Sequence, residues 1–417
     1  MTQDDTAYVL GTFGTLLLDA GMSVTDVREH LEEAAFIADA DDVVTFSVLP
    51  TLVLAGRGGT EPAILATTQG DLSLQLAARA NTLNRLLRRG SMGVADLPAR
   101  IAEIRAMTRP PSLMRWVSGS TLVGIGLAVL FRCDWWAILA AAVASVVVGG
   151  ITGLMNRQPR AAAIVPFVVA FASTLIVGGA AQGLHAGPVP LFALCAPIAI
   201  LVPGALITNA LLELTAQDIV TGSARLVYGM IVLAFMSAGI AAGATATGLR
   251  LDPASAALVG EIAGVHSDLQ GWGAVPPLWV SWFGVVLLAV GIALAFGAGA
   301  RLGLLCIAAM ICAYALLVAL TPLGGKVFAT GAACALLFLL SRLVGSLIMA
   351  VPAAVSFQPA FLLLVPGTVG LVALAAADET ALTVALETLV SLCIGIKVGA
   401  LLADGVAHLR RHLPRIP

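Results

Sequence analysis

Long apolar stretches joined by short polar connections occupy most of the chain beyond position 110. A helix that crosses a lipid bilayer needs about 20 predominantly apolar residues, within a range of about 17–25. Windows of this size predict ten spans, at residues 113–131, 135–155, 161–181, 188–212, 223–247, 277–298, 301–320, 327–349, 354–377 and 381–402. The pattern therefore indicates an all-α polytopic membrane protein with ten transmembrane helices.

Charged residues are spread unevenly between the first 115 residues and the rest of the chain. Only 11% of the 417 residues are charged, against about 25% in soluble proteins. Residues 1–115 carry 24 of the charges, whereas the much longer remainder of the chain carries 22. A water-soluble head, residues 1–110, is thus predicted to precede a lipid-embedded body. The net charge of −2 argues against nucleic-acid binding. The six scattered cysteines support neither a zinc site nor a disulfide framework, so we expect no metal and no cofactor.

Basic residues in short loops predict the orientation, because they favour the cytoplasmic side of a membrane. With the head inside, nine such arginines lie inside, and two arginines and one lysine lie outside. Both termini are therefore expected in the cytoplasm. The body then divides into five spans (111–248), an external loop (249–276), five further spans (277–403) and a basic cytoplasmic tail (404–417). Three GxxxG pairs predict close helix contacts, namely Gly149/Gly153, Gly239/Gly243 and Gly395/Gly399.

The head is predicted to be a small α+β module. Its pattern indicates helices at 7–20, 25–38, 73–89 and 91–107, with short strands at 43–49, 51–56 and 62–67. Ser23 or Thr25 is expected to cap the second helix. This helix carries several charges, which we interpret as a solvated face: Asp26, Arg28, Glu29, Glu32 and Glu33. No nucleophile with a base and an orienting group can be assembled from the head, so no catalytic residue is predicted.

One tetrapeptide occurs twice. Leu-Val-Pro-Gly stands at 201–204 and again at 364–367, and each copy lies in the fourth span of a set of five. Because five is odd, the second set crosses the membrane in the opposite sense to the first. This arrangement is typical of transporters built from two inverted repeats.

Proline interrupts a helix in a way that matters in lipid. It removes one backbone hydrogen bond, so the carbonyls of Ala199 and Leu362 must find another partner. Two interrupted helices meeting near the midplane would surround a cavity suited to a zwitterion or a carboxylate. The residues predicted to line it are Pro203, Gly204, Thr208, Asn209, Pro366 and Gly367. The alternative is a pair of proline kinks without a ligand.

Three charged residues lie inside predicted spans and five or more residues from either end. Glu387 lies about 10 Å below the outer end of the tenth span, where an ionised carboxylate is costly. An acid that gains and loses a proton there would couple transport to a proton gradient; the alternative is a packed acid that stays protonated. Arg342 and Lys397 lie in the inner thirds of their spans. Arg342 either binds a substrate carboxylate or extends to the headgroups, and the same choice holds for Lys397.

The first LVPG copy also begins a longer run that resembles the threonine/serine exporter family. The family pattern has LVPG, a Thr-Asn-Ala segment, two acids, and Ser/Thr-Gly before Ala-Arg-Leu. The matching residues here are Leu201–Ala210, Glu213, Asp218, Thr221, Gly222, Arg225 and Leu226. The resemblance extends over nearly the whole chain, since the second half is similar to a companion domain that some bacteria encode separately. It implies a fused two-domain form of the family.

What the resemblance implies is export of threonine and serine across the bacterial inner membrane, driven by the proton motive force. Related two-chain systems imply dicarboxylates such as succinate as an alternative. We predict an alternating-access exporter, not an enzyme, whose substrate enters from the cytoplasm near Glu213, Asp218 and Arg225. Its expected partners are a small amino acid, protons and the lipid bilayer, and homo-oligomerisation stays open. Rival interpretations are a membrane-embedded hydrolase using the head, or a sensor head with a membrane anchor.

Overall fold

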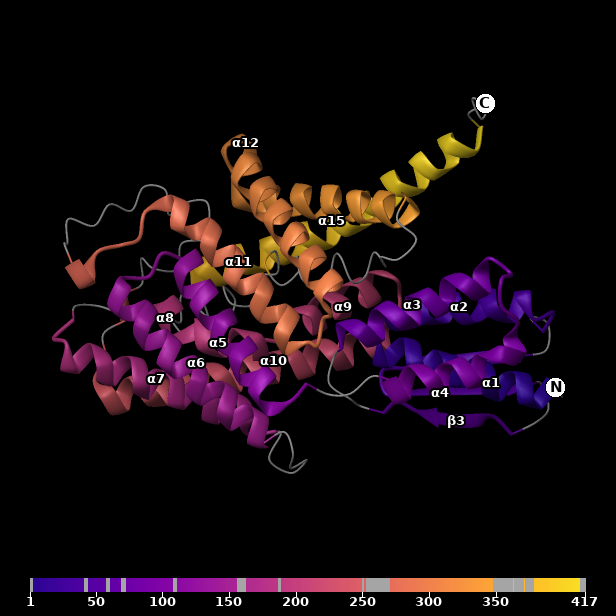
Figure 1. Ribbon diagram of the computed structural model, residues 1–417, viewed down its shortest axis with the longest axis horizontal. Helices are drawn as coiled ribbons and strands as arrows, with labels where there is room; N and C mark the ends of the chain where they lie inside the picture. The colour runs from indigo at the N-terminus through magenta and orange to yellow at the C-terminus, as the bar shows by residue number, and fades with distance from the viewer. Residues whose placement is uncertain are drawn as a thin grey trace.

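The computed structural model describes residues 3–40, 44–57, 61–68, 73–107, 111–155, 163–186, 189–249, 251–252, 271–347, 363, 371 and 379–412. Most of these residues are helical. Figure 1 shows the head, in indigo to purple, at one end of the molecule, with the long apolar helices of the body extending away from it.

The head combines helices with a small sheet. In chain order its elements are α1 (Gln3–Asp19), α2 (Val24–Ile37), β1 (Val44–Leu49), β2 (Leu52–Arg57), β3 (Ala63–Ala66), α3 (Leu74–Arg88), η1 (Val94–Asp96) and α4 (Leu97–Met107). The strands form an antiparallel sheet in the order β1-β2-β3. Val53 and Ala55, two residues apart on β2, are both buried, as are Phe13 of α1 and Leu31 of α2. Because alternate strand residues share a face, this side of the sheet contributes to a core made with the helices.

Ser23, and not Thr25, caps α2. Its hydroxyl accepts a hydrogen bond from the Asp26 amide at 3.1 Å and donates one to the Asp26 carboxylate at 2.7 Å. This reciprocal cap satisfies one of the free amides at the helix start. The turn before it passes through Gly21 with φ of 81°, a left-handed conformation that glycine adopts without strain. Thr25 is therefore free to make the contact with the body described below.

The described part of the body contains seven helices long and apolar enough to cross a membrane, or eight if one bent pair counts as a span. The seven are α5 (Leu113–Leu130), α6 (Trp135–Met155), α7 (Val165–Gly183), α10 (Ile219–Thr247), α11 (Leu278–Ala295), α12 (Ala300–Leu347) and α15 (Glu379–His412). The bent pair consists of α8 (Leu191–Cys195) with η2 (Ala196–Leu201), followed by α9 (Gly204–Thr215). The protein is thus a multi-pass membrane protein.

Helix α12 covers the predicted span 301–320 and most of the predicted span 327–349. Its backbone leaves helical geometry at Gly324 and Gly325, and Pro322 stands just before this break. Gly325 has φ of 75°, which side-chain-bearing residues rarely adopt. Figure 1 shows the helix changing direction sharply, with its second part running beside α15. The ninth predicted span, 354–377, lies almost entirely outside the described residues.

Glycines bring the first helices of the two halves, α5 and α11, into backbone contact. A Cβ atom placed on Gly126 would lie 2.8 Å from the carbonyl oxygen of Gly284, and one on Gly291 would lie 2.8 Å from that of Gly119. The early glycine of α5 therefore faces the late glycine of α11, and the reverse, so the two helices run antiparallel. Such close approach is how membrane helices gain packing energy where lipid supplies no hydrophobic drive.

The three predicted GxxxG pairs also make close contacts, and this expectation is confirmed. Gly149 and Gly153 of α6 face α5, whereas the other two pairs join equivalent helices of the two halves. Gly239 and Gly243 of α10 lie against α7, and Gly395 and Gly399 of α15 lie against the second part of α12. In each half, the fifth predicted span is thus packed on the third.

The glycine contact between α5 and α11 yields a stability prediction. In Gly126→Ala the added methyl group meets α11 backbone, and we expect unfolding to become easier by about 1–3 kcal/mol, as in other overpacked interiors. The matched control is Gly150→Ala on α6, where a Cβ atom would have nothing within 4 Å. This control should unfold at the wild-type temperature or slightly above it, because alanine favours helix. Thermal unfolding of the detergent-purified variants is the measurement, and equal melting temperatures for both would contradict the prediction.

Candidate functional site

The first LVPG copy lies at a break between two short helices. The segment formed by α8 and η2 ends at Leu201, Val202 is extended, and α9 begins at Gly204 after a bend of 69°. Pro203 has no amide hydrogen to donate to the Ala199 carbonyl. That carbonyl instead accepts a hydrogen bond from the Val202 amide at 3.1 Å. The predicted need for another partner is thus met inside the chain, three residues further on.

Some polar groups near this break form hydrogen bonds with one another. The Gly204 amide donates to the Val202 carbonyl at 2.8 Å, and the buried Thr208 hydroxyl donates to the Gly204 carbonyl at 3.0 Å. Asn209 is half-buried. The second copy, with Pro366 and Gly367, lies outside the described residues, so the predicted meeting of the two copies stays a prediction.

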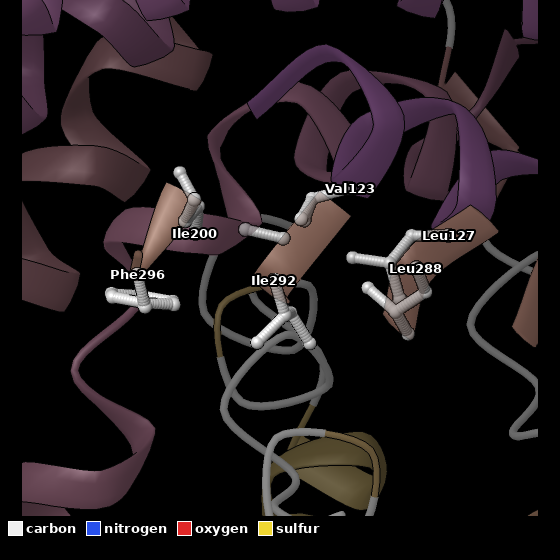
Figure 2. A pocket seen from close by; sticks show the side chains of 7 residues that line it. Val123, Leu127, Ile200, Leu288, Ile292 and Phe296 are labelled. Carbon is white, nitrogen blue, oxygen red and sulfur yellow. The ribbon is translucent and has the colours of Figure 1, made fainter. Parts of the chain in front are cut away.

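A small pocket borders the break, between the two halves of the body (Figure 2). It is lined by Val123 and Leu127 of α5, Leu288 and Ile292 of α11, and Ala199 and Ile200 of η2. Phe296, which directly follows α11, completes the lining. The labelled side chains are all hydrocarbon. The pocket therefore offers space at the interface between the halves, and the described residues that line it contribute polar groups only through their backbone.

The three residues predicted at the cytoplasmic entrance come together at the turn between α9 and α10. Gln217 takes a left-handed conformation with φ of 68°, which folds α10 back onto α9. Gly222 lets the two helices approach closely, since a Cβ atom there would lie 2.8 Å from the Ala210 carbonyl oxygen. This hairpin aligns Glu213 of α9 with Arg225 of α10, and it places Asp218 at the tip.

Glu213 is fully buried and links three helices. One carboxylate oxygen, Oε1, accepts hydrogen bonds from the Val24 amide of α2, at 3.0 Å, and from the Arg225 guanidinium of α10. A carboxylate is well placed at the start of α2, where the amides are free and the helix dipole is positive. The other oxygen, Oε2, has no hydrogen-bond partner within the described part of the chain. The head therefore rests directly on a charge held inside the body.

Asp218 makes a second contact with the same head helix. Its two oxygens accept hydrogen bonds at 2.7 Å from the Thr25 hydroxyl and from the Arg28 guanidinium. Burial disfavours the ionised form, but these two hydrogen bonds outweigh it and lower the pKa of Asp218. A carboxyl group whose pKa is lowered by folding stabilises the folded state at any pH above its unfolded pKa, which is near 3.9 for aspartate. This stabilisation is lost as the pH falls through the lower pKa of the folded state. The contact is thus fully present at neutral pH.

The interpretation of the α2 charges as a solvated face is wrong for Arg28, which contacts the body, whereas Asp26, Glu29 and Glu32 are exposed as that interpretation expects. Arg28 binds Asp218 of the body, Asp26 binds Ser23, and Glu33 binds Arg88 of α3 at 2.7 Å. The sequence gives little signal for the contact between Arg28 and Asp218, because the two residues are 190 positions apart. The spacing of Thr25 and Arg28 places both on one helix face, but it does not identify what that face meets.

The structure leaves the other predicted site residues apart from this cluster. Arg342 is exposed on α12, with its guanidinium carbon 5.5 Å from the centre of the Phe338 ring. Glu387 and Lys397 are exposed on α15. Within the described part of the chain, none of these three forms an ion pair. The same part contains no group of three His, Cys, Asp or Glu residues arranged to hold a metal ion.

The buried ion pair between Glu213 and Arg225 yields the second prediction. In Glu213→Gln the shape is kept but Arg225 loses its counter-charge, and breaking a buried pair costs about 3–5 kcal/mol. We therefore expect a marked drop in the thermal unfolding temperature. The control is Glu103→Gln, which removes an ion pair with Arg100 on the exposed surface of α4 and should change little. Similar melting temperatures for the two variants would show that Glu213 does not hold the structure together.

Comparisons with known proteins place the chain in a family. A family model described as "Putative threonine/serine exporter" matches residues 8–247. The match covers more than half of the chain and includes the head, the first LVPG copy and the cluster of Glu213, Asp218 and Arg225. Comparisons with curated proteins and with solved structures found no match. The matched residues include the head and a set of apolar helices. Because the match covers more than half of the chain, the chain belongs to the ThrE family of threonine/serine exporters.

Proposed function

We propose that the protein is a secondary active exporter of threonine and serine in the bacterial cytoplasmic membrane, driven by the proton motive force. The observation that carries the proposal is the family match over residues 8–247, which spans the head and the helices from α5 to α10. Both termini are proposed to lie in the cytoplasm. Figure 1 supports this, because the C-terminal end of α15, in yellow, lies toward the same end of the molecule as the head.

Two inverted five-helix repeats, ten spans in all, are the proposed architecture of the body. The offset along the sequence from Gly119 and Gly126 of α5 to Gly284 and Gly291 of α11 nearly equals the offset between the two LVPG copies. The antiparallel contact between α5 and α11 agrees with a two-fold axis in the membrane plane. The packing of the fifth span on the third in both halves agrees with it as well. The two helix contacts support the repeat independently of the tetrapeptide.

Alternating access is proposed to operate by movement of one repeat against the other. The pocket supports this, because it lies between α5, α11 and η2 and adjoins the break at LVPG. The amides of Ala205 and Leu206 precede the first helical hydrogen bond of α9, which runs from Ile207 to Pro203. Amides at a helix start suit a substrate carboxylate. The proposed substrate site therefore comprises Pro203, Gly204, Thr208 and Asn209, completed by Pro366, Gly367 and Arg342.

Glu387 is the proposed proton-coupling residue. It is exposed on α15 among the apolar side chains of Leu386, Val390 and Ile394, which are exposed as well. An ionised carboxylate is costly in such surroundings, and binding a proton lowers this cost because it removes the charge. Glu387 thus has the chemistry that a proton-coupled cycle requires.

Reconstituted vesicles test the function directly. We expect vesicles loaded with radiolabelled threonine or serine to release it faster when a pH gradient is imposed, and a protonophore to abolish the increase. Succinate, tested in parallel, distinguishes the dicarboxylate alternative. Proton-dependent flux of succinate without flux of threonine or serine would replace the proposed substrate. An absence of flux for all three, with folded protein in the vesicles, would refute the exporter.

The coupling role of Glu387 has its own test. In Glu387→Gln we expect at least a tenfold loss of the flux that depends on the pH gradient, while exchange of threonine across the vesicle without a gradient is retained. Glu103→Gln, on the exposed surface of the head, serves as the control and should keep both rates. Unchanged gradient-driven flux in Glu387→Gln would remove this residue from the mechanism.

The broken helix is tested by filling the position after the proline. Gly204 is buried, so a leucine there has to displace the surrounding side chains and close the space beside the break. We expect Gly204→Leu to lose threonine flux and the control Gly183→Leu to keep it, because a Cβ atom at Gly183 has nothing within 4 Å. Wild-type flux in Gly204→Leu would contradict a substrate site at this break.

A further inference from the structure

The head contacts both halves of the body, and it does so through the starts of two different helices. The first contact joins α2 to the α9–α10 hairpin, through Glu213 and Asp218 as described above. The second joins α3 to the turn between α11 and α12. There the Leu74 amide, at the start of α3, donates to the Phe296 carbonyl at 3.0 Å.

The contact at α3 is apolar as well as hydrogen-bonded. Leu74 is 1% exposed and packs with the buried residues of the body, although it belongs to the head by sequence. Leu302 of α12 packs against the cores of both parts. Phe296, which holds the α3 amide, also lines the pocket between the two halves. The head is thus attached directly to the interface at which the halves meet.

The two contacting helices of the head belong to one compact unit. Leu31 of α2 and Ala80, Leu83 and Leu87 of α3 are buried in the same core, and the Glu33–Arg88 ion pair joins the two helices on the surface. Because this unit cannot stretch, it fixes the distance between the α9–α10 hairpin and the α11–α12 turn. A movement of one half against the other therefore requires one of the two contacts to open.

The chemistry of the two contacts decides which one opens. The contact at α2 consists of charged and hydrogen-bonding groups, whose hydrogen bonds water can replace when they separate. The contact at α3 buries a leucine side chain, and opening it would expose this apolar side chain to water at a cost in free energy. The hairpin contact is therefore the one whose groups water can solvate after they separate, and we expect it to open when the halves move.

We propose that the head is a cytoplasmic clasp, which bridges the two halves and must release the α9–α10 hairpin during each transport cycle while α3 stays attached to the α11–α12 turn. This inference rests on the proposed alternating access between the halves. It assigns Thr25, Arg28 and the Val24 amide a role in transport without any contact with the substrate. Glu213 and Asp218 then serve as the attachment points for the clasp.

A reversible crosslink tests the release. In Thr25→Cys/Asp218→Cys, a short bifunctional methanethiosulfonate reagent joins the head to the hairpin, and dithiothreitol removes the link. We expect threonine flux in the crosslinked protein to fall at least tenfold below that of the same variant after reduction. Equal flux in the two states of this variant would overturn the clasp, because transport would then proceed with the contact locked.

The matched control is Glu33→Cys/Arg88→Cys, which crosslinks α2 to α3 inside the head and leaves the hairpin untouched. Its flux should be the same before and after reduction. Treated wild-type protein controls for the six native cysteines, which are buried or half-buried. A loss of flux in the head-internal crosslink equal to that in the hairpin crosslink would also overturn the proposal, since rigidity of the head alone would explain it.

Hydrogen exchange of the wild-type protein in vesicles gives a readout that does not depend on flux. The Val24 and Leu74 amides each donate across one of the two contacts. We expect Val24 to exchange at least tenfold faster than Leu74, and to exchange faster still with threonine and a pH gradient. Slower exchange at Val24 than at Leu74 would contradict the release of α2. Fast exchange at Val24 in vesicles that show no flux of threonine, serine or succinate would refute the exporter while leaving the release of the head intact.

Discussion

Close backbone contact between helices is the constraint on which the body depends. Lipid tails are as apolar as leucine side chains, so burial in a membrane provides no hydrophobic drive for helices to associate. The body gains its packing where glycines remove side chains and allow one backbone to meet another. The contact of Gly126 with Gly284 and that of Gly119 with Gly291 hold the two halves together in this way. A side chain at any of these four glycines would meet the backbone of the opposite helix, so this contact depends on glycine at each of them.

Two polar groups in the interior of the body bind partners within the chain. The Ala199 carbonyl, which Pro203 cannot bind, accepts a hydrogen bond from the Val202 amide. The buried Glu213 carboxylate accepts hydrogen bonds from the start of α2 and from Arg225. Each case follows from the high cost of an unpaired polar group away from water. Glu213 differs from the others in that one of its partners belongs to the head. A buried charge therefore depends on a part of the chain that water can reach.

The break at LVPG, the pocket and the head lie along one connected path. The residues before the break line the pocket, Phe296 lines it from the other half, and the Phe296 carbonyl binds the start of α3. From α3 the path continues through the core of the head to α2, and then to Glu213 on the same helix that begins at the break. A displacement of one half relative to the other therefore changes the contacts of the head, and attachment of the head constrains both halves. The proposed release of the α9–α10 hairpin would open this closed circuit of contacts.

The sequence by itself determined the features that depend on local composition and spacing. It predicted the apolar helices of the described body, the helices and strands of the head, the interruption at Pro203 and the three GxxxG contacts, because hydropathy, proline chemistry and helical periodicity act over a few residues. It also carried the family resemblance that the comparison over residues 8–247 confirmed. Only the tertiary structure decided which distant segments meet. The glycines of α5 and α11 are spaced by seven residues and so escape a search for GxxxG, and Arg28 resembles a solvent-facing residue until Asp218 is placed beside it. The reason is physical: a residue type states what a side chain can bind, whereas its partner is selected by the path of the backbone between them.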